Sequence, residues 1–168
     1  MGKGQAGRWK LLIFILVGLV VLLAAGALGL AGRQSPDNGV VVINGTEVPP
    51  VPSLDPQQVA LGEQLYRQYC VNCHGANLEG AQDWKKSLAD GSLPPPPHNN
   101  SGHTWHHPDS LLLNIILEGG EKLYGGTMPP FNDRLTRKDT ESILDFFKSR
   151  WGKEEREYQW WMTVTDAR

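Results

Sequence analysis

Cysteine is scarce in this sequence, and its scarcity excludes several kinds of site. The 168 residues contain two cysteines, Cys70 and Cys73, which lie three positions apart. Two thiols cannot supply a cysteine-rich structural zinc site, which needs further ligands. They also cannot form the several disulfide bonds that stabilise many small domains. The interior of the protein therefore has to be filled and held together by other means.

Charge is absent from Leu11 to Ala31, a run of 21 residues. As a helix this run is about 31 Å long, close to the hydrocarbon thickness of a bilayer, so it is predicted to be a transmembrane helix. The preceding residues 1–10 carry three basic side chains and no acidic one. This asymmetry predicts a cytoplasmic N-terminus and places all that follows the helix on the periplasmic or outer side of the cell membrane. The alternative is a cleaved signal peptide, since Ala25-Gly26-Ala27 is typical of a processing site.

Acidic residues are likewise missing from the first 33 residues. The remainder carries 18 acidic and 12 basic residues, a formal charge of −6. This balance argues against binding to nucleic acid, which requires a basic patch. It predicts instead partner proteins with basic docking faces, towards which an acidic domain is steered at low salt.

The two cysteines belong to the motif Cys70-Val71-Asn72-Cys73-His74. Two thiols at this spacing can each form a thioether bond to one vinyl group of a haem, while the adjacent imidazole reaches the iron. A redox or zinc CxxC is the alternative, but a redox motif needs no histidine after it and a zinc site needs further ligands. The sequence therefore predicts one covalent haem c, which also fills much of the core of a small domain.

The chain divides into segments of different composition. Residues 32–55 are rich in Gly, Pro, Ser and Asn, which is typical of a linker. Within them, Asn44-Gly45 predicts the turn of a small hairpin. N-cap residues and apolar spacing predict helices at about 56–69, 108–117 and 138–151. The predicted parts are a cytoplasmic N-terminus (1–10), a transmembrane helix (11–31), the linker (32–55), a haem domain (56–151) and an aromatic C-terminal tail (152–168).

The stretch around the cysteine motif resembles the opening of a class I c-type cytochrome with one haem. The residues that carry the resemblance are Gly62-x-x-Leu65-Tyr66-x-x-x-Cys70-x-x-Cys73-His74-Gly75. The resemblance implies an all-α fold around the haem, in which the helix over 138–151 packs on Gly62 and Tyr66 of the first helix. It also implies that a carbonyl group from one of Pro94 to Pro97 accepts the Nδ1 proton of His74.

The second axial position of the iron has Met128 as its candidate ligand. This residue lies in Gly125-Gly126-Thr127-Met128-Pro129-Pro130-Phe131, which resembles the Met-Pro motif of the family, and it is the only methionine between the first and last predicted helices. The competing ligands are His98, His103, His106 and His107. With His74 and Met128 on the iron, both axial positions are filled, so the centre passes single electrons and does not transform a substrate.

The predicted function is that of a membrane-anchored electron carrier with no catalytic residues of its own. Family analogy implies an electron-transfer subunit of a respiratory or photosynthetic membrane complex, such as alternative complex III, a cytochrome bc-type complex or a terminal oxidase. One alternative is a free-standing tethered cytochrome that shuttles electrons to a terminal oxidase or reaction centre. A haem enzyme with an open distal site and a haem sensor are the remaining alternatives.

The C-terminal tail contains the aromatic run Tyr158-Gln159-Trp160-Trp161. Exposed aromatic side chains at this density mark a docking surface, either on a partner protein or at the membrane interface. The alternative is that these side chains fold back onto the haem domain.

Overall fold

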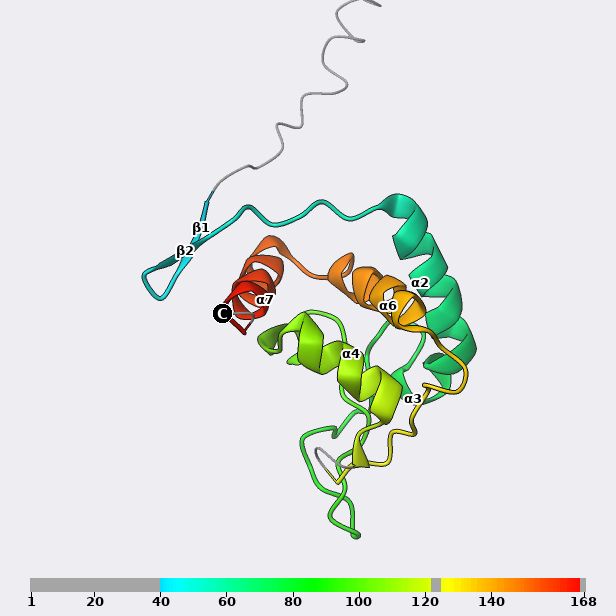
Figure 1. The fold of residues 1–168 in the computed structure, drawn as a ribbon. Coiled ribbons are helices and arrows are strands. Elements are labelled where there is room, and N and C mark those ends of the chain that lie inside the picture. The colour runs from blue at the N-terminus through cyan, green and yellow to red at the C-terminus, as the bar shows by residue number, and fades with distance from the viewer. Residues whose placement is uncertain (1–39, 122–124, 167–168) are drawn as a thin grey trace, which may run out of the picture. The chain divides into compact units, whose positions relative to one another are not determined.

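The computed structural model describes residues 40–121 and 125–166 (Figure 1). The predicted segments 1–10 and 11–31 lie outside the described residues. Within the described ranges, no helix is both long enough and apolar enough to cross a bilayer. The elements, in chain order, are β1 (Val41–Ile43), β2 (Thr46–Val48), α2 (Pro56–Tyr69), α3 (Val71–His74), η1 (Thr104–His106), α4 (Asp109–Glu118), α6 (Arg137–Lys148) and α7 (Lys153–Asp166).

Helices α2 and α6, from the start and end of the predicted haem domain, cross each other closely. A Cβ atom built on Gly62 of α2 would lie 1.8 Å from the backbone oxygen of Ser142 in α6, so only glycine fits at this contact. One turn further along α2, the ring of Tyr66 packs against Phe146 and Phe147 of α6, with centroids 5.4 and 5.8 Å apart. The fold is thus a mostly helical, cytochrome c-like domain, with the crossing at the residues where the family resemblance implies it.

Local signals explain where these helices begin. The Asp55 carboxylate accepts a hydrogen bond from the backbone N–H of Gln57 at 2.8 Å, which caps α2. A capping box between Thr136 and Asp139 starts α6. Helix α4 starts one residue later than predicted, because Pro108 is its N-cap and not its first helical residue.

The end of α6 differs from the sequence-based expectation. This helix ends at Lys148, whereas its predicted range extends to Trp151. Trp151 is buried beyond the helix, and its indole N–H donates a hydrogen bond to the backbone oxygen of His98 at 2.7 Å. The core of the domain comprises Tyr66, Cys70, Leu78, Leu112, Leu113, Ile116, Phe131, Leu135, Ile143, Leu144, Phe146, Phe147 and Trp151.

The hairpin β1–β2 has the turn that Asn44-Gly45 indicates. Both residues have positive φ values, 51° and 74°, as a two-residue turn of this kind requires. Val41 pairs with Val48, and these two side chains are buried on the face of the hairpin where β1 packs against α7. Two apolar residues of the linker, Val41 and Val48, therefore have a partner within the chain itself, whereas Val40 and Val42 are exposed.

The C-terminal tail is mostly helix α7, which lies against the rest of the described domain. The Gln159 side chain is buried, and its Nε2 donates to the backbone oxygen of His107 at 3.3 Å and to the Asp109 carboxylate at 2.5 Å. The hydroxyl of Thr163 accepts a hydrogen bond from the backbone N–H of Asp109 at 3.1 Å. Of the two alternatives for the tail, this arrangement is the one in which it folds back onto its own domain.

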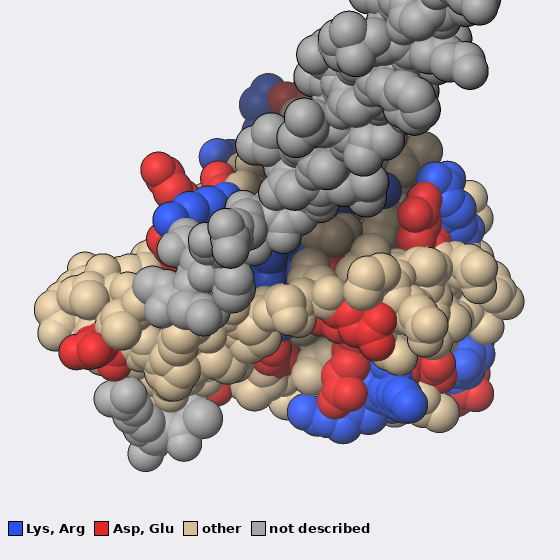
Figure 2. Space-filling view, turned by 90° about the horizontal axis from the view of Figure 1, so that it is seen from above, with Lys and Arg blue, Asp and Glu red and all other residues tan. Residues whose placement is uncertain are grey.

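Charged residues of both signs are mixed on the surface. In Figure 2, lysines and arginines lie beside aspartates and glutamates on the visible face, with uncharged surface between them. Several of these neighbours form exposed ion pairs, such as Arg67 with Glu63 and Arg137 with Glu141. Exposed pairs of this kind contribute little to stability, so the fold depends mainly on its apolar core.

Candidate haem site

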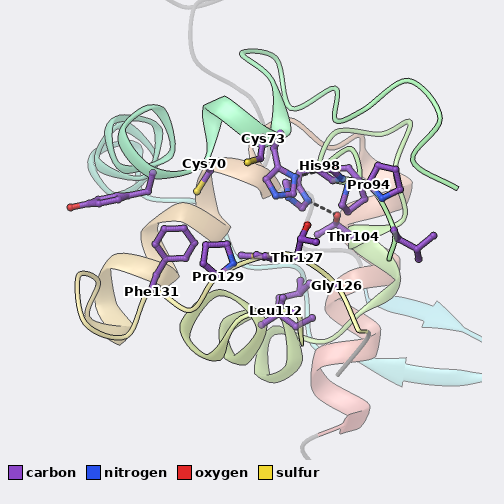
Figure 3. A pocket seen from close by; sticks show the side chains of 18 of the residues that line it. Cys70, Cys73, Pro94, His98, Thr104, Leu112, Gly126, Thr127, Pro129 and Phe131 are labelled. Atoms are coloured by element: carbon purple, nitrogen blue, oxygen red, sulfur yellow. Dashed lines mark hydrogen bonds between the residues drawn. The ribbon is translucent and has the colours of Figure 1, made fainter. Parts of the chain in front are cut away.

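A cavity of about 270 Å³ lies beside α3, and Figure 3 shows the side chains around it. Among the described residues, its wall contains no lysine, arginine, aspartate or glutamate. The wall is formed by residues from separate stretches of the chain, which are Tyr69, Cys70, Cys73 and His74, Leu93 to Pro96 with His98, His103, Thr104 and His107, Leu112 and Ile115, and Gly120, Gly126 to Pro129 and Phe131. All four predicted haem-binding residues, Cys70, Cys73, His74 and Met128, line it.

The two cysteines lie at the single helical turn α3, which directly follows α2. Backbone N–H groups of Cys73 and His74 both donate to the Cys70 oxygen, at 3.1 and 3.0 Å, so the turn holds both thiols and the imidazole beside one cavity. Burial, followed by the neighbouring Cys73, raises the pKa of the Cys70 thiol to about 12. A reactive redox CxxC requires a lowered thiol pKa, so this environment does not favour that alternative. Among the residues that the structure describes, no group of three or more His, Cys, Asp or Glu could hold a metal ion.

His74 is oriented by a hydrogen bond from its ring to the proline-rich loop. The Nδ1 atom donates to the backbone oxygen of Pro96 at 3.0 Å, which leaves Nε2 as the nitrogen able to bind iron. Burial lowers the pKa of His74, although the Pro96 carbonyl opposes this effect, so the neutral imidazole that can act as a ligand is favoured. The family resemblance implies a carbonyl from one of Pro94 to Pro97, and in the structure it is that of Pro96.

Tyr66 supports the same turn from α2. Its hydroxyl donates to the backbone oxygen of Gly75 at 2.6 Å, and burial raises the pKa of this hydroxyl well above its usual range. Gly75 has a positive φ of 81°, which lets the chain turn sharply after His74. The family resemblance implies that Tyr66 packs on the helix predicted over 138–151. It does not predict the hydrogen bond from Tyr66 to the haem-binding turn.

Met128 reaches the cavity from the loop that follows α4. The backbone oxygen of Met128 accepts a hydrogen bond from the N–H of Gly120 at 3.0 Å, and a Cβ atom on Gly119 would lie only 2.8 Å from that oxygen. The loop is therefore held closely against the end of α4. In the view of Figure 3, Thr127 and Pro129 lie on the side of the cavity away from Cys73.

The four loop histidines have different positions. His98, His103 and His107 line the cavity, whereas His106 is exposed and lies against Trp105, with ring centroids 3.8 Å apart. The ring of His98 stacks on that of His74 at 4.3 Å. This places His98 on the same side of the cavity as His74, so it cannot bind the iron from the opposite side.

These residues fit a covalent haem. An apolar wall, two thiols one helical turn apart, an imidazole with only Nε2 free and a thioether from a separate loop form the set of groups that a c-type haem uses. A family model described as Cytochrome C oxidase, cbb3-type, subunit III matches residues 57–147, more than half of the chain. The chain belongs to this family.

As a member of the cbb3-type subunit III family, the protein is a c-type cytochrome that binds haem c covalently and carries electrons. It is 29% identical over 147 residues to the quinohemoprotein alcohol dehydrogenase ADH IIB of Pseudomonas putida, across 88% of this chain and 17% of that protein. Among solved structures, it is similar to cytochrome CL of Methylophaga aminisulfidivorans, with 20% identity, a TM-score of 0.46 and coverage of 62% of this chain and 61% of that one. The chain thus spans less than two thirds of the length of either protein.

Proposed function

We propose that this c-type cytochrome is a membrane-anchored carrier of single electrons, with Cys70 and Cys73 bound to the haem and with His74 and Met128 as axial iron ligands. The observation that carries the proposal is that one apolar cavity brings together all four residues, which come from α3 and a loop more than fifty residues later. The haem supplies the one-electron couple. The protein attaches it, orients its ligands and excludes water from it.

Individual residues of the site have separable tasks. The Pro96 carbonyl fixes the tautomer and orientation of His74, as an outer hydrogen-bond partner does for a ligating histidine. A thioether from Met128 favours the reduced iron more than a second imidazole would. The uncharged wall excludes water, which also raises the potential because burial disfavours the additional positive charge of oxidised iron.

Covalent attachment can be tested by haem staining after denaturing electrophoresis. The double variant Cys70→Ala/Cys73→Ala removes both thioether bonds, so we expect no stained band, while each single variant should show weaker staining. His106→Ala is a matched control, because His106 is exposed and does not line the cavity. Full staining of the double variant would refute the attachment site.

We further propose that the protein is a subunit of a respiratory or photosynthetic membrane complex, anchored by residues 11–31 with its haem domain on the outer side. Three observations support this assignment: the uncharged run itself, the family description as a subunit of an oxidase, and the similarity to a part of a much longer dehydrogenase. Its partners would then include redox proteins with basic docking faces, since the chain beyond residue 33 is acidic. Alternative complex III remains one candidate for the complex.

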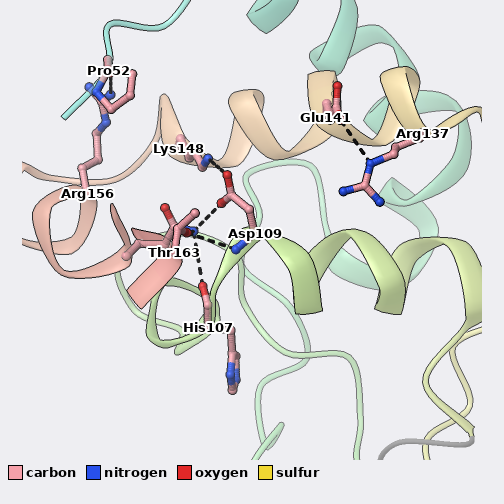
Figure 4. A network of polar contacts seen from close by, with 9 residues as sticks. Pro52, His107, Asp109, Arg137, Glu141, Lys148, Arg156 and Thr163 are labelled. Atoms are coloured by element: carbon pink, nitrogen blue, oxygen red, sulfur yellow. Dashed lines mark hydrogen bonds and ion pairs between the residues drawn. The ribbon is translucent and has the colours of Figure 1, made fainter. Parts of the chain in front are cut away.

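The attachment of the hairpin to α7 favours a fixed subunit over a freely swinging tethered carrier. The indole N–H of Trp160 donates to the backbone oxygen of Pro49 at 2.7 Å. The Arg156 guanidinium donates to the backbone oxygen of Pro52 at 2.7 Å (Figure 4). Helix α7 is itself tied to α4 through Gln159. Residues 49–55, which directly precede α2, are therefore held at two points of α7.

Distance measurements between spin labels can distinguish the two kinds of carrier. Labels at Glu47→Cys in the hairpin and Glu141→Cys in α6 should give one narrow distance distribution, because both positions are exposed on parts that are fixed relative to each other. Trp160→Ala should broaden this distribution. The control Trp161→Ala should leave it narrow, since the ring of Trp161 packs on Tyr158 of its own helix. A broad distribution in the parent protein would favour the swinging carrier.

A further inference from the structure

His98 lies between two aromatic rings in the wall of the haem cavity. Its ring stacks on Phe147 of α6, with centroids 4.5 Å apart and an angle of 15° between the planes. On its other side it faces His74, at 4.3 Å and 32°. The three rings form a stack that connects the core helix α6 to the residue beside the iron position.

Three hydrogen bonds fix His98 within this stack, and a fourth fixes its partner Thr104. Its backbone N–H donates to the oxygen of Leu78 at 2.8 Å, and its backbone oxygen accepts from the indole of Trp151 at 2.7 Å. The ring atom Nδ1 lies 2.8 Å from the hydroxyl oxygen of Thr104. That hydroxyl donates its own hydrogen to the backbone oxygen of Pro97 at 3.2 Å. Neither the backbone nor the ring of His98 can therefore turn without breaking a hydrogen bond.

The hydroxyl of Thr104 also determines which nitrogen of His98 carries the proton. Because the only hydrogen of this hydroxyl points to Pro97, its oxygen must accept the bond from His98, so Nδ1 of His98 is the protonated atom. These hydrogen bonds therefore fix both the orientation and the tautomer of the His98 ring.

We propose that His98 is a positioning residue that fixes the plane of the His74 imidazole. The hydrogen bond from His74 to Pro96 restrains only the Nδ1 edge of the ring, so the ring can still tilt about this edge. The rigid His98 ring against the face of His74 opposes this tilt. The plane of an axial imidazole determines its overlap with the iron orbitals and hence the ferric spectrum and the reduction potential. The inference rests on the proposed assignment of His74 as an iron ligand.

The test compares two substitutions of similar volume in the holoprotein. His98→Phe keeps a flat ring in the stack, whereas His98→Leu fills the space without one. We expect His98→Leu to shift the g values of the low-spin ferric haem in electron paramagnetic resonance and to change the reduction equilibrium by up to about tenfold, which is about 59 mV for one electron. His98→Phe should restore values close to those of the parent. His106→Phe, at an exposed loop position, is the control.

Each outcome has a defined meaning. Parent-like g values and potential in both His98 variants would overturn the proposal, and so would equal shifts in both, because the flat ring would then have no specific effect. If the leucine variant loses its haem, Thr104→Val with the parent histidine gives the second measurement: it removes the hydroxyl that orients His98 and should shift the g values in the same direction. A parent protein without a low-spin haem signal would refute the proposed function as well, which distinguishes the two failures.

Discussion

At the scale of single residues, the haem site depends on side chains that hold the ligands as well as on the ligands themselves. His74 is oriented by Pro96, and Tyr66 holds the turn that follows His74. The backbone oxygen of Met128 accepts a hydrogen bond from the N–H of Gly120, which holds Met128 in place. Changes at the site should therefore separate into effects on ligation and effects on orientation.

Met128 is the residue whose substitution should change ligation alone. Met128→His is expected to leave a low-spin haem with a lower reduction potential, because imidazole favours ferric iron more than a thioether does. Met128→Ala should open the iron to added ligands such as cyanide or imidazole, which optical titration would detect. Unchanged spectra and potentials in both variants would mean that Met128 is only a packing residue of the cavity wall.

His98 should make the stability of the protein depend on pH. Burial lowers the pKa of His98 in the folded state from its ordinary value of 6.5. Below pH 6.5 the unfolded chain therefore binds a proton at His98 that the folded protein does not bind. The free energy of unfolding is therefore not reduced by His98 above pH 6.5. As the pH falls from 6.5 towards the folded pKa, the free energy of unfolding decreases by at most about 1.4 kcal/mol per pH unit. Urea unfolding at a series of pH values should show a shallower slope for His98→Phe. An identical slope in parent and variant would exclude His98 as its source.

At the scale of elements, the crossing of α2 and α6 supports one wall of the haem site. Signals close together in sequence predict both helices, since Asp55 with Pro56 starts one and the capping box at Thr136 starts the other. Their crossing point was also foreseen, because glycine at position 62 interrupts an otherwise ordinary helical pattern. The position of α7 could not be predicted, since Trp160 and Pro49 are 111 residues apart and no local pattern relates them.

The proline-rich loop also makes a contact that the sequence could not predict. Four consecutive prolines exclude a helix, but they do not reveal which carbonyl faces His74. The stack of His98 on His74 likewise depends on where α6 places Phe147. Local signals therefore predict the elements and the candidate ligands, whereas the partners that orient those ligands are determined by tertiary packing.

Gly62→Ala should separate α2 from α6. The added Cβ would lie 1.8 Å from a backbone oxygen, which cannot move aside as a flexible side chain can, so we expect a loss of about 3 kcal/mol or more in unfolding free energy. Gly152→Ala is the matched control, because its nearest contact is the mobile end of the Glu155 side chain. Equal stabilities of the two variants in denaturant unfolding would contradict the close crossing.

At the scale of the whole molecule, the net charge of the chain is not matched by charged residues around the haem cavity. The chain beyond residue 33 has a formal charge of −6, yet none of the described residues that line the haem cavity is a lysine, arginine, aspartate or glutamate. Long-range attraction to a partner should therefore depend on salt, whereas the final contact at the cavity should not. This separates the rate of encounter from the rate of electron transfer within a formed complex.

The expected result can be measured with small redox reagents and stopped-flow absorbance. Oxidation by a cationic reagent should slow by about tenfold between low and high ionic strength, because screening removes its attraction to the acidic protein. Oxidation by an anionic reagent of similar potential should accelerate over the same range. Rates that are independent of salt for both reagents would show that the net charge does not act at the haem site.

The attachment of the hairpin to α7 also has a consequence for biosynthesis. The ribosome makes β1 and β2 before the other described elements and α7 after them, so the buried face of Val41 and Val48 has no cover until α7 has been made. The cysteine motif at positions 70–74 emerges well before that point, and haem attachment does not have to wait for α7. Closing a contact across 111 residues is also entropically the costliest step of the fold. We therefore expect docking of the hairpin to be the final event of maturation, one that occurs only in a chain whose last helix has been made.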